Sequence, residues 1–306
     1  MLRHVCAMLL ALILPATALA ADPPPKPDAA EAARANDIAL LKSLKPAHGV
    51  AKLPKADVTL DLGQNYYFLG QEDSREVIEE GWGNPKGSAD DVLGMVFPSG
   101  QTPLDNPGWG AVITWKPTGY VSDKDARTTN YDDILKQLRD GQEEDNKERK
   151  KDGAREMQLV GWAQPPSYDQ TAHSLIWARD LEVSDVKEHT LNYDMRLLGR
   201  KGVLSLNVVG GMNQLSDVRT AAEALRKVAI FDQGSRYADY KPESDKRAAF
   251  GIGGLILGGA GLVVAKKAGL LAVALLFFKK GFVVIAAAAA GMWAWLKRVF
   301  GGKKSA

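Results

Sequence analysis

The chain has 306 residues and a formal charge of only +2, but that charge is divided unevenly along it. Residues 246–306 hold ten Lys or Arg and no acidic residue, whereas residues 21–245 hold 28 Lys or Arg against 37 Asp or Glu, a net charge of −9. An acidic central part argues against nucleic-acid binding, because neutralisation of phosphates dominates that affinity.

Residues 1–20 have the features of a secretory signal peptide. A basic start precedes an apolar core, and Ala18-Leu19-Ala20 fits an A-x-A cleavage site. An uncleaved N-terminal anchor is the alternative. The only cysteine, Cys6, lies in this segment. We therefore expect an exported mature chain without disulfides, thiolate metal sites or cysteine nucleophiles.

Residues 21–49 are predicted to form a proline-rich spacer followed by a short helix. The spacer begins with ADPPPKP, a sequence that cannot be helical. Asp28 and Glu31 then have the spacing of a helix N-terminus, and the helix is expected to run to about residue 44.

Residues 50–245 predict one acidic α+β domain, rich in antiparallel strands with a few packed helices. Helical spacing marks residues 131–138 and 215–230, and the charged EEDNKERKKD is interpreted as a solvated helix surface. Residues 193–197 and 204–208 alternate apolar with polar residues, which predicts a hairpin with one buried and one wet face. Residues 233–246 are expected to be a neck. Other strands are expected at residues 57–62, 92–97, 110–115, 157–162 and 175–183.

Residues 246–306 predict a basic membrane-anchoring tail with one or two transmembrane helices. Residues 248–265 are an unbroken apolar run of 18 residues, long enough to span a hydrocarbon core of about 30 Å. Gly254 and Gly258 form a G-x-x-x-G pattern that favours helix packing. Residues 281–296 offer a second crossing. The lipid bilayer is thus the expected partner of the tail, with its basic residues at anionic headgroups.

Motifs for catalysis and for metal or cofactor binding are absent. The mature histidines His48, His173 and His189 do not form H-x-x-x-H, so no metal site is predicted. No G-x-S-x-G and no phosphate-binding glycine loop occurs, so no cofactor is predicted. Asp123 and Asp125 lie in a sequence that lacks the glycine and glutamate of a calcium loop, which favours a turn capped by carboxylates.

Aromatic residues beside turn formers and charges are the remaining candidates for a site. Such mixtures line ligand grooves and protein interfaces, although they also occur where tryptophans fill a core. Asp169 and His173 are the candidates for acid–base catalysis. The candidate ligand- or partner-binding residues are Trp82, Asn84, Trp162, Tyr168, Trp177 and Arg196.

The chain resembles a bacterial family of membrane-anchored proteins known as domain-of-unknown-function family 2167. The resemblance runs from about residue 50 through the tail, and it implies a membrane-anchored architecture without an assigned activity or cofactor. The segments that carry it are WGNP (82–85), GYVSDKDA (119–126), GWAQPPSYD (161–169), LNYDMRLLGRKGVLSLN (191–207) and GSRYADYKPESDKRAAFGI (234–252).

These features favour a non-enzymatic binding, assembly or stress-related factor of the bacterial cell envelope. Its soluble domain is expected in the periplasm and its tail in the inner membrane, since outer-membrane spans are normally β-barrels. Another envelope protein or a second copy of the chain is the expected protein partner. The alternatives are an anchored hydrolase of cell-wall or carbohydrate material that uses Asp169 and His173, and a pore formed by the tail.

Overall fold

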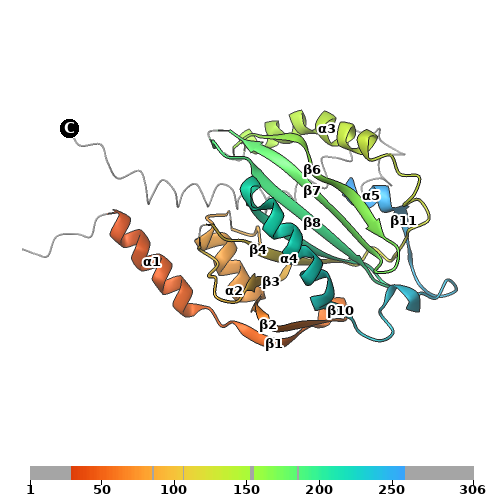
Figure 1. Ribbon diagram of the computed structural model, residues 1–306, viewed down its shortest axis with the longest axis horizontal. Coiled ribbons are helices and arrows are strands. Elements are labelled where there is room, and N and C mark those ends of the chain that lie inside the picture. The colour runs from red at the N-terminus through yellow and green to blue at the C-terminus, as the bar shows by residue number, and fades with distance from the viewer. Residues whose placement is uncertain (1–28, 85, 106, 152–154, 185, 259–306) are drawn as a thin grey trace, which may run out of the picture.

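The computed structural model describes residues 29–84, 86–105, 107–151, 155–184 and 186–258. In these residues one large antiparallel sheet has nine strands, with the order β1-β2-β3-β4-β9-β8-β7-β6 and with β10 paired to β2 (Figure 1). The predicted α+β class with antiparallel strands is confirmed.

The strands lie where apolar and polar residues alternate or where several apolar residues follow one another, and several strands are longer than predicted. A second, two-stranded sheet pairs β5 (Tyr120–Ser122) in parallel with β11 (Arg247–Gly251). The strands of the large sheet are β1 (Ala47–Leu53), β2 (Val58–Gly70), β3 (Val92–Pro98), β4 (Gly110–Lys116), β6 (Met157–Asp169), β7 (Ser174–Val183), β8 (Thr190–Leu198), β9 (Val203–Gly211) and β10 (Ala229–Phe231).

The helices lie against both faces and one edge of this sheet. Figure 1 shows α4 crossing one face, whereas α3 follows the β6 edge. The predicted helix at 215–230 ends two residues early, because Ala229 and Ile230 pair with β2. The helices are α1 (Ala29–Ser43), α2 (Gln71–Glu76), α3 (Tyr131–Lys151), α4 (Leu215–Val228) and α5 (Ile252–Ile256).

Alternation along the strands separates two cores. Under α4, one core collects the odd-numbered residues of β8 with the even-numbered residues of β9, such as Met195 and Leu206. On the opposite face, Trp177 of β7 packs with α3 and α5 in a second core. A third cluster packs Val77 and Ile78, from the helical turn that follows α2, against strands β2 to β4.

Helix α3 completes the free edge of β6. The Asn146 side chain donates to the carbonyl of Met157 at 2.8 Å and accepts from its amide at 2.9 Å, and Gln142 accepts from the amide of Leu159 at 2.6 Å. These bonds satisfy edge groups that would otherwise be available to another chain. The charged segment interpreted as a solvated surface therefore also has a structural role.

The hairpin of β8 and β9 is confirmed, but the prediction that one of its faces is wet is wrong. Asn192, Asp194 and Ser205 on that face are 0%, 1% and 2% exposed. Burial of Asn192 and Asp194 is tolerated because these side chains hydrogen-bond to polar side chains on neighbouring strands.

The predicted neck packs against the domain instead of linking it to the tail. Arg200 makes a two-bond contact with Asp245, with Nε–Oδ2 and Nη2–Oδ1 distances of 2.6 and 2.8 Å. Tyr237 is buried and stacks on Tyr120 with ring centroids 4.6 Å apart. Residues 233–246 are therefore part of the fold.

The first half of the apolar run 248–265 also differs from the prediction, since it forms β11 and α5 and not one continuous helix. Asp125 accepts hydrogen bonds from the amides of Ile252 and Gly253 at 2.9 and 3.3 Å, which fixes the start of α5. Ile252, Leu255 and Ile256 then fill the second core.

None of the helices in the described part of the chain is both long enough and apolar enough to cross a bilayer. The predicted signal peptide at 1–20 and the tail from residue 259 onward lie outside the described residues.

Candidate anion-binding pocket

A row of polar side chains crosses three strands on the face of the sheet opposite α4. Asp194 of β8 accepts hydrogen bonds from Arg179 Nη2 at 3.0 Å, Arg196 Nη2 at 2.9 Å and Asn207 Nδ2 at 3.0 Å. Asn207 in turn accepts from Asn192 at 3.0 Å. The strand register explains the contacts, because Asp194 lies directly opposite Asn207 on β9. One carboxylate thus serves two guanidinium groups, and the row keeps an excess of positive charge.

Arg196 is held in place from two sides. Its guanidinium carbon lies 5.2 Å from the ring centroid of Trp177, and Asp194 fixes its Nη2 atom. A cation over an aromatic face and a charge-assisted hydrogen bond both favour one orientation. Sequence reasoning selected Trp177 and Arg196, and the structure brings these two together.

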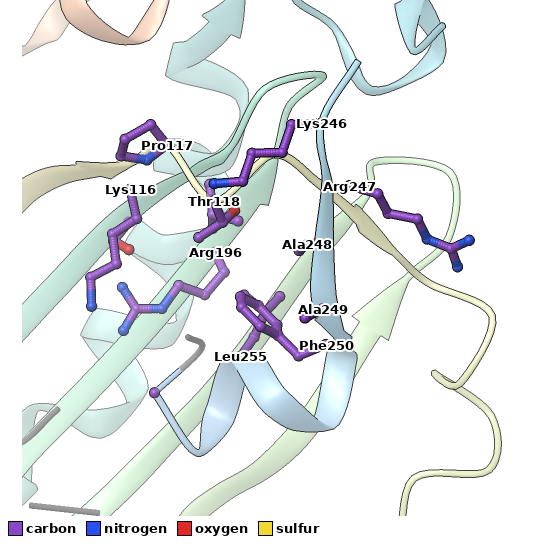
Figure 2. A pocket seen from close by; sticks show the side chains of 13 residues that line it. Lys116, Pro117, Thr118, Arg196, Lys246, Arg247, Ala248, Ala249, Phe250 and Leu255 are labelled. Carbon is purple, nitrogen blue, oxygen red and sulfur yellow. The ribbon is translucent and has the colours of Figure 1, made fainter. Parts of the chain in front are cut away.

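Arg196 extends the polar row into a pocket of about 400 Å³. Figure 2 shows the Lys116 and Arg196 side chains reaching from β4 and β8 into the same space, with Lys246 extending toward Thr118 and Arg247 directed away. No Asp or Glu is among the described residues that line the pocket. These residues are Lys116, Pro117, Thr118, Arg196, Val203, Ser205, Lys246, Arg247, Ala248, Ala249, Phe250, Leu255 and Gly258.

The surroundings of Lys116 disfavour its charged form. The pKa of Lys116 is lowered to about 8, because surrounding protein atoms desolvate the ammonium group and Arg196 repels it, while the carboxylates of Asp194 and Asp91 oppose the shift. The side chain nevertheless keeps contact with solvent. An anion placed here would stabilise the charged form of Lys116. The arrangement suits anion binding and contains no paired acid and base among its described lining.

Strand β11 forms one wall of the pocket through a close backbone approach. Tyr120 N donates to the carbonyl of Lys246 at 2.9 Å. Gly119 has φ +87°, and a Cβ atom there would lie 2.5 Å from the same oxygen. Glycine is needed both for the left-handed backbone and for the space.

The other aromatic candidates lie elsewhere and make structural contacts. Trp82 Nε1 donates to the carbonyl of Pro103 at 2.9 Å, and Asn84 Nδ2 donates to the carbonyl of Ile78 at 2.6 Å, so both hold the loop after α2. Trp162 packs beside the second core.

The proposed acid–base pair is not brought together. Asp169 accepts from the amides of Thr171 and Ala172 and from Arg226 Nη1 at 2.7 Å. The Ala172 hydrogen bond is the main cause of its lowered pKa. This carboxylate therefore stabilises the turn between β6 and β7.

His173 instead meets Tyr168 and Asp123. Its Nδ1 lies 3.3 Å from Tyr168 Oη and 3.7 Å from Asp123 Oδ2, and its ring stacks on Tyr237 with centroids 4.1 Å apart. Tyr168 also donates to Asp123 at 3.0 Å. Over the described residues, no three His, Asp or Glu side chains gather as metal ligands would.

Gly254 and Gly258 do not share one continuous helix. Gly254 is buried in α5, whereas Gly258 lies beyond the end of α5 with φ +103° and lines the pocket. A positive φ is incompatible with a right-handed helix. The predicted G-x-x-x-G face is therefore interrupted.

Sequence reasoning missed Lys116 and most of the polar row. The available signal was that polar residues at 192, 194 and 196, and again at 205 and 207, alternate with apolar ones. The face that carries these polar residues was predicted to be exposed to solvent. Lys116 gave no local signal, because its proximity to Arg196 depends on the pairing of β4, β9 and β8.

The family model described as "Protein of unknown function (DUF2167)" matches residues 45–290. The chain belongs to this family. The match confirms the resemblance noted in the sequence and includes the whole pocket. No curated protein matches the chain.

One solved structure similar to the chain is the solution structure of cyanobacterial PsbP (CyanoP) from Synechocystis sp. PCC 6803. The alignment has 8% sequence identity and a TM-score of 0.34, and it covers 62% of this chain and 92% of that one.

Proposed function

We propose that this member of the DUF2167 family is a non-enzymatic, membrane-anchored binding component of the bacterial cell envelope. In this proposal the folded domain lies in the periplasm, the tail lies in the inner membrane, and the pocket binds an anionic ligand. The observation that carries the proposal is that Lys116, Arg196 and Lys246 line one pocket whose described lining includes no Asp or Glu.

Binding is favoured over catalysis by the kind of charge in the pocket. Asp194 and Trp177 hold Arg196 in one orientation, which lowers the cost of ordering it around a ligand. A bound anion would stabilise the charged form of Lys116, which desolvation disfavours in its absence. Neither feature supplies the acid and base that hydrolysis needs.

Anchoring is supported by the sequence that follows the pocket. Residues 268–278 and 281–296 are apolar, and Lys pairs separate the apolar segments without any acidic residue. A chain that ends at Gly258 gives the test. The full chain should stay with membranes after an alkaline carbonate wash, and the shortened chain should be released. Release of both chains would overturn the anchoring.

The binding proposal is tested by photo-crosslinking in cells. A photoreactive residue at Ala249, which is exposed and lines the pocket, should form an adduct, whereas one at the exposed Lys227 of α4 serves as the control. The adduct should disappear when Lys116→Gln and Lys246→Gln are combined. An adduct that survives both changes, or none at Ala249, would contradict anion recognition.

A hydrolase of cell-wall or carbohydrate material is the second candidate. The contact of His173 with Tyr168 and Asp123 favours it, but the structural role of Asp169 weakens it. Purified peptidoglycan should remain uncleaved by the protein. Cleavage that is lost in His173→Ala, with the fold retained by circular dichroism, would replace the binding proposal with this one.

A further inference from the structure

We infer that the pocket receives the phosphate-bearing headgroup of an anionic lipid, whose acyl part lies along the apolar wall formed by β11 and α5. This inference rests on the proposed function, since it assigns a chemical class to the anion that the pocket binds.

The charged side of the pocket fits a phosphate. Lys116 and Arg196 approach from β4 and β8, the two strands on either side of β9, and Lys246 belongs to the segment that precedes β11 (Figure 2). Three cations on different elements can surround a phosphate, whose oxygens accept several charge-assisted hydrogen bonds at once. The hydroxyls of Thr118 and Ser205 add polar groups to the same lining.

The opposite side of the pocket fits a hydrocarbon chain. Ala248 and Phe250 of β11 contribute partly exposed apolar surface to the lining, together with the buried Val203 and Leu255. A free phosphate would leave that surface in contact with water, whereas an amphiphile would cover it. Burial of apolar surface is favourable, so the combined lining selects a ligand with an anionic head and an apolar body.

The position of the pocket points to the same ligand. Gly258 lines it, and the sequence from that residue onward is the apolar and basic tail expected in the membrane. With the tail in the bilayer, the pocket would lie near the headgroups, where anionic lipids attract basic residues. The bulk of the domain, with its net charge of −9, would be repelled from that surface.

The test uses the full chain in the neutral detergent dodecyl maltoside. Isothermal titration compares dihexanoyl phosphatidylglycerol, dihexanoyl phosphatidylcholine, glycerol 3-phosphate and an acidic peptide. The pocket variant combines Lys116→Gln with Lys246→Gln. A matched control combines Lys136→Gln with Lys227→Gln, which removes the same charge from exposed positions on α3 and α4. Circular dichroism checks that both variants fold.

We expect phosphatidylglycerol to bind best and to lose at least about tenfold in affinity in the pocket variant but not in the control, as loss of charge-assisted bonds predicts. Glycerol 3-phosphate binding as tightly as the lipid would overturn the lipid inference and leave the anion pocket standing. Preference for the acidic peptide would overturn it in favour of a protein partner. Absence of binding by all four probes would overturn both the inference and the proposed anion recognition.

Discussion

Asp194 is the residue on which the polar row inside the sheet depends. It is 1% exposed and accepts hydrogen bonds from Arg179, Arg196 and Asn207. Its removal leaves two guanidinium groups without their shared carboxylate. Loss of one partner of a buried ion pair typically costs about 3–5 kcal/mol.

Asp194→Asn should therefore lower the free energy of unfolding by about 3–5 kcal/mol, measured by urea denaturation of the full chain in detergent. The exposed pair of Arg75 and Asp90 provides the control, and Asp90→Asn should cost less than about 1 kcal/mol. Equal losses in the two variants would show that Asp194 does not hold the row together.

The lowered pKa of Lys116 predicts a pH dependence of anion binding. Without ligand, Lys116 loses its proton as the pH rises through about 8. A bound anion raises that pKa, so affinity should be constant below pH 7 and fall by up to about tenfold per pH unit above 8. Titration of dihexanoyl phosphatidylglycerol at pH 7, 8 and 9 measures the fall. Lys116→Arg should remove the pH dependence because arginine stays charged; an unchanged fall would assign it to another group.

Local sequence pattern predicts some residues of the site but not their surroundings. Trp177 and Arg196 were found because an aromatic residue and a cation stand out in a strand-forming sequence. Asp194 and Asn207 were placed in water because alternation reveals which residues share a face but not what covers that face. Only the pairing of β7, β8 and β9 shows that these polar groups satisfy one another.

At the scale of elements, α3 acts as a cover for the β6 edge. Asn146→Ala removes both hydrogen bonds to Met157. Amide hydrogen exchange at Met157 should then become at least about tenfold faster, since a local opening costs less without them. Lys136→Ala on the same helix should leave that amide unchanged. Equal protection in wild type and Asn146→Ala would show that the side chain does not protect the edge.

The contact of Arg200 with Asp245 joins the β8–β9 turn to the segment before β11. Hydrogen bonds from Arg200 are the main cause of the lowered pKa of Asp245, about 2 against an ordinary 3.8. Because the folded-state value lies below the unfolded one, Asp245 adds stability above about pH 4 that is lost as the pH falls toward 2.

Arg200→Gln should therefore weaken the acid dependence of unfolding. Urea midpoints measured at pH 5, 4 and 3 should fall less steeply in the variant than in the wild type. The separate pair of Arg236 and Asp239 keeps its own contribution in both chains. An equally steep fall would mean that the contact does not stabilise the folded state.

Most helices and strands were predictable because each has its own periodicity, and the ends of the elements were not. Helix α4 stops where its chain joins β2, and the charged half of α3, expected to be solvated, bonds to β6 through its polar side chains. Both outcomes depend on partners distant in sequence.

At the scale of the whole molecule, the described start of the tail is part of the folded domain. A chain that stops after Lys246 lacks Ile252, Leu255 and Ile256, which are buried in the second core. Losing three large apolar side chains should cost on the order of 5 kcal/mol or more. A chain that stops after Gly258 should keep its stability in a urea denaturation followed by tryptophan fluorescence. Equal stability of the two chains would contradict a structural role for α5.

The composition of residues 248–257 does not distinguish a membrane-spanning helix from a segment buried in the folded domain. An apolar run with glycines is compatible with a membrane helix and equally with a buried strand and short helix. The deciding contacts come from Asp125 and from β5, more than a hundred residues earlier in the chain. Such long-range pairing leaves no local trace in the sequence.

The burial of α5 also means that the second core is completed late in the synthesis of the chain. Synthesis proceeds from the N-terminus, so β5 and α3 are made long before the side chains that pack against them. The second core receives its last residues only when translation has reached the anchor segment. The last part of the core to be made is thus the part next to the proposed anchor, and an interrupted chain presents an unfinished core to the cell's proteases.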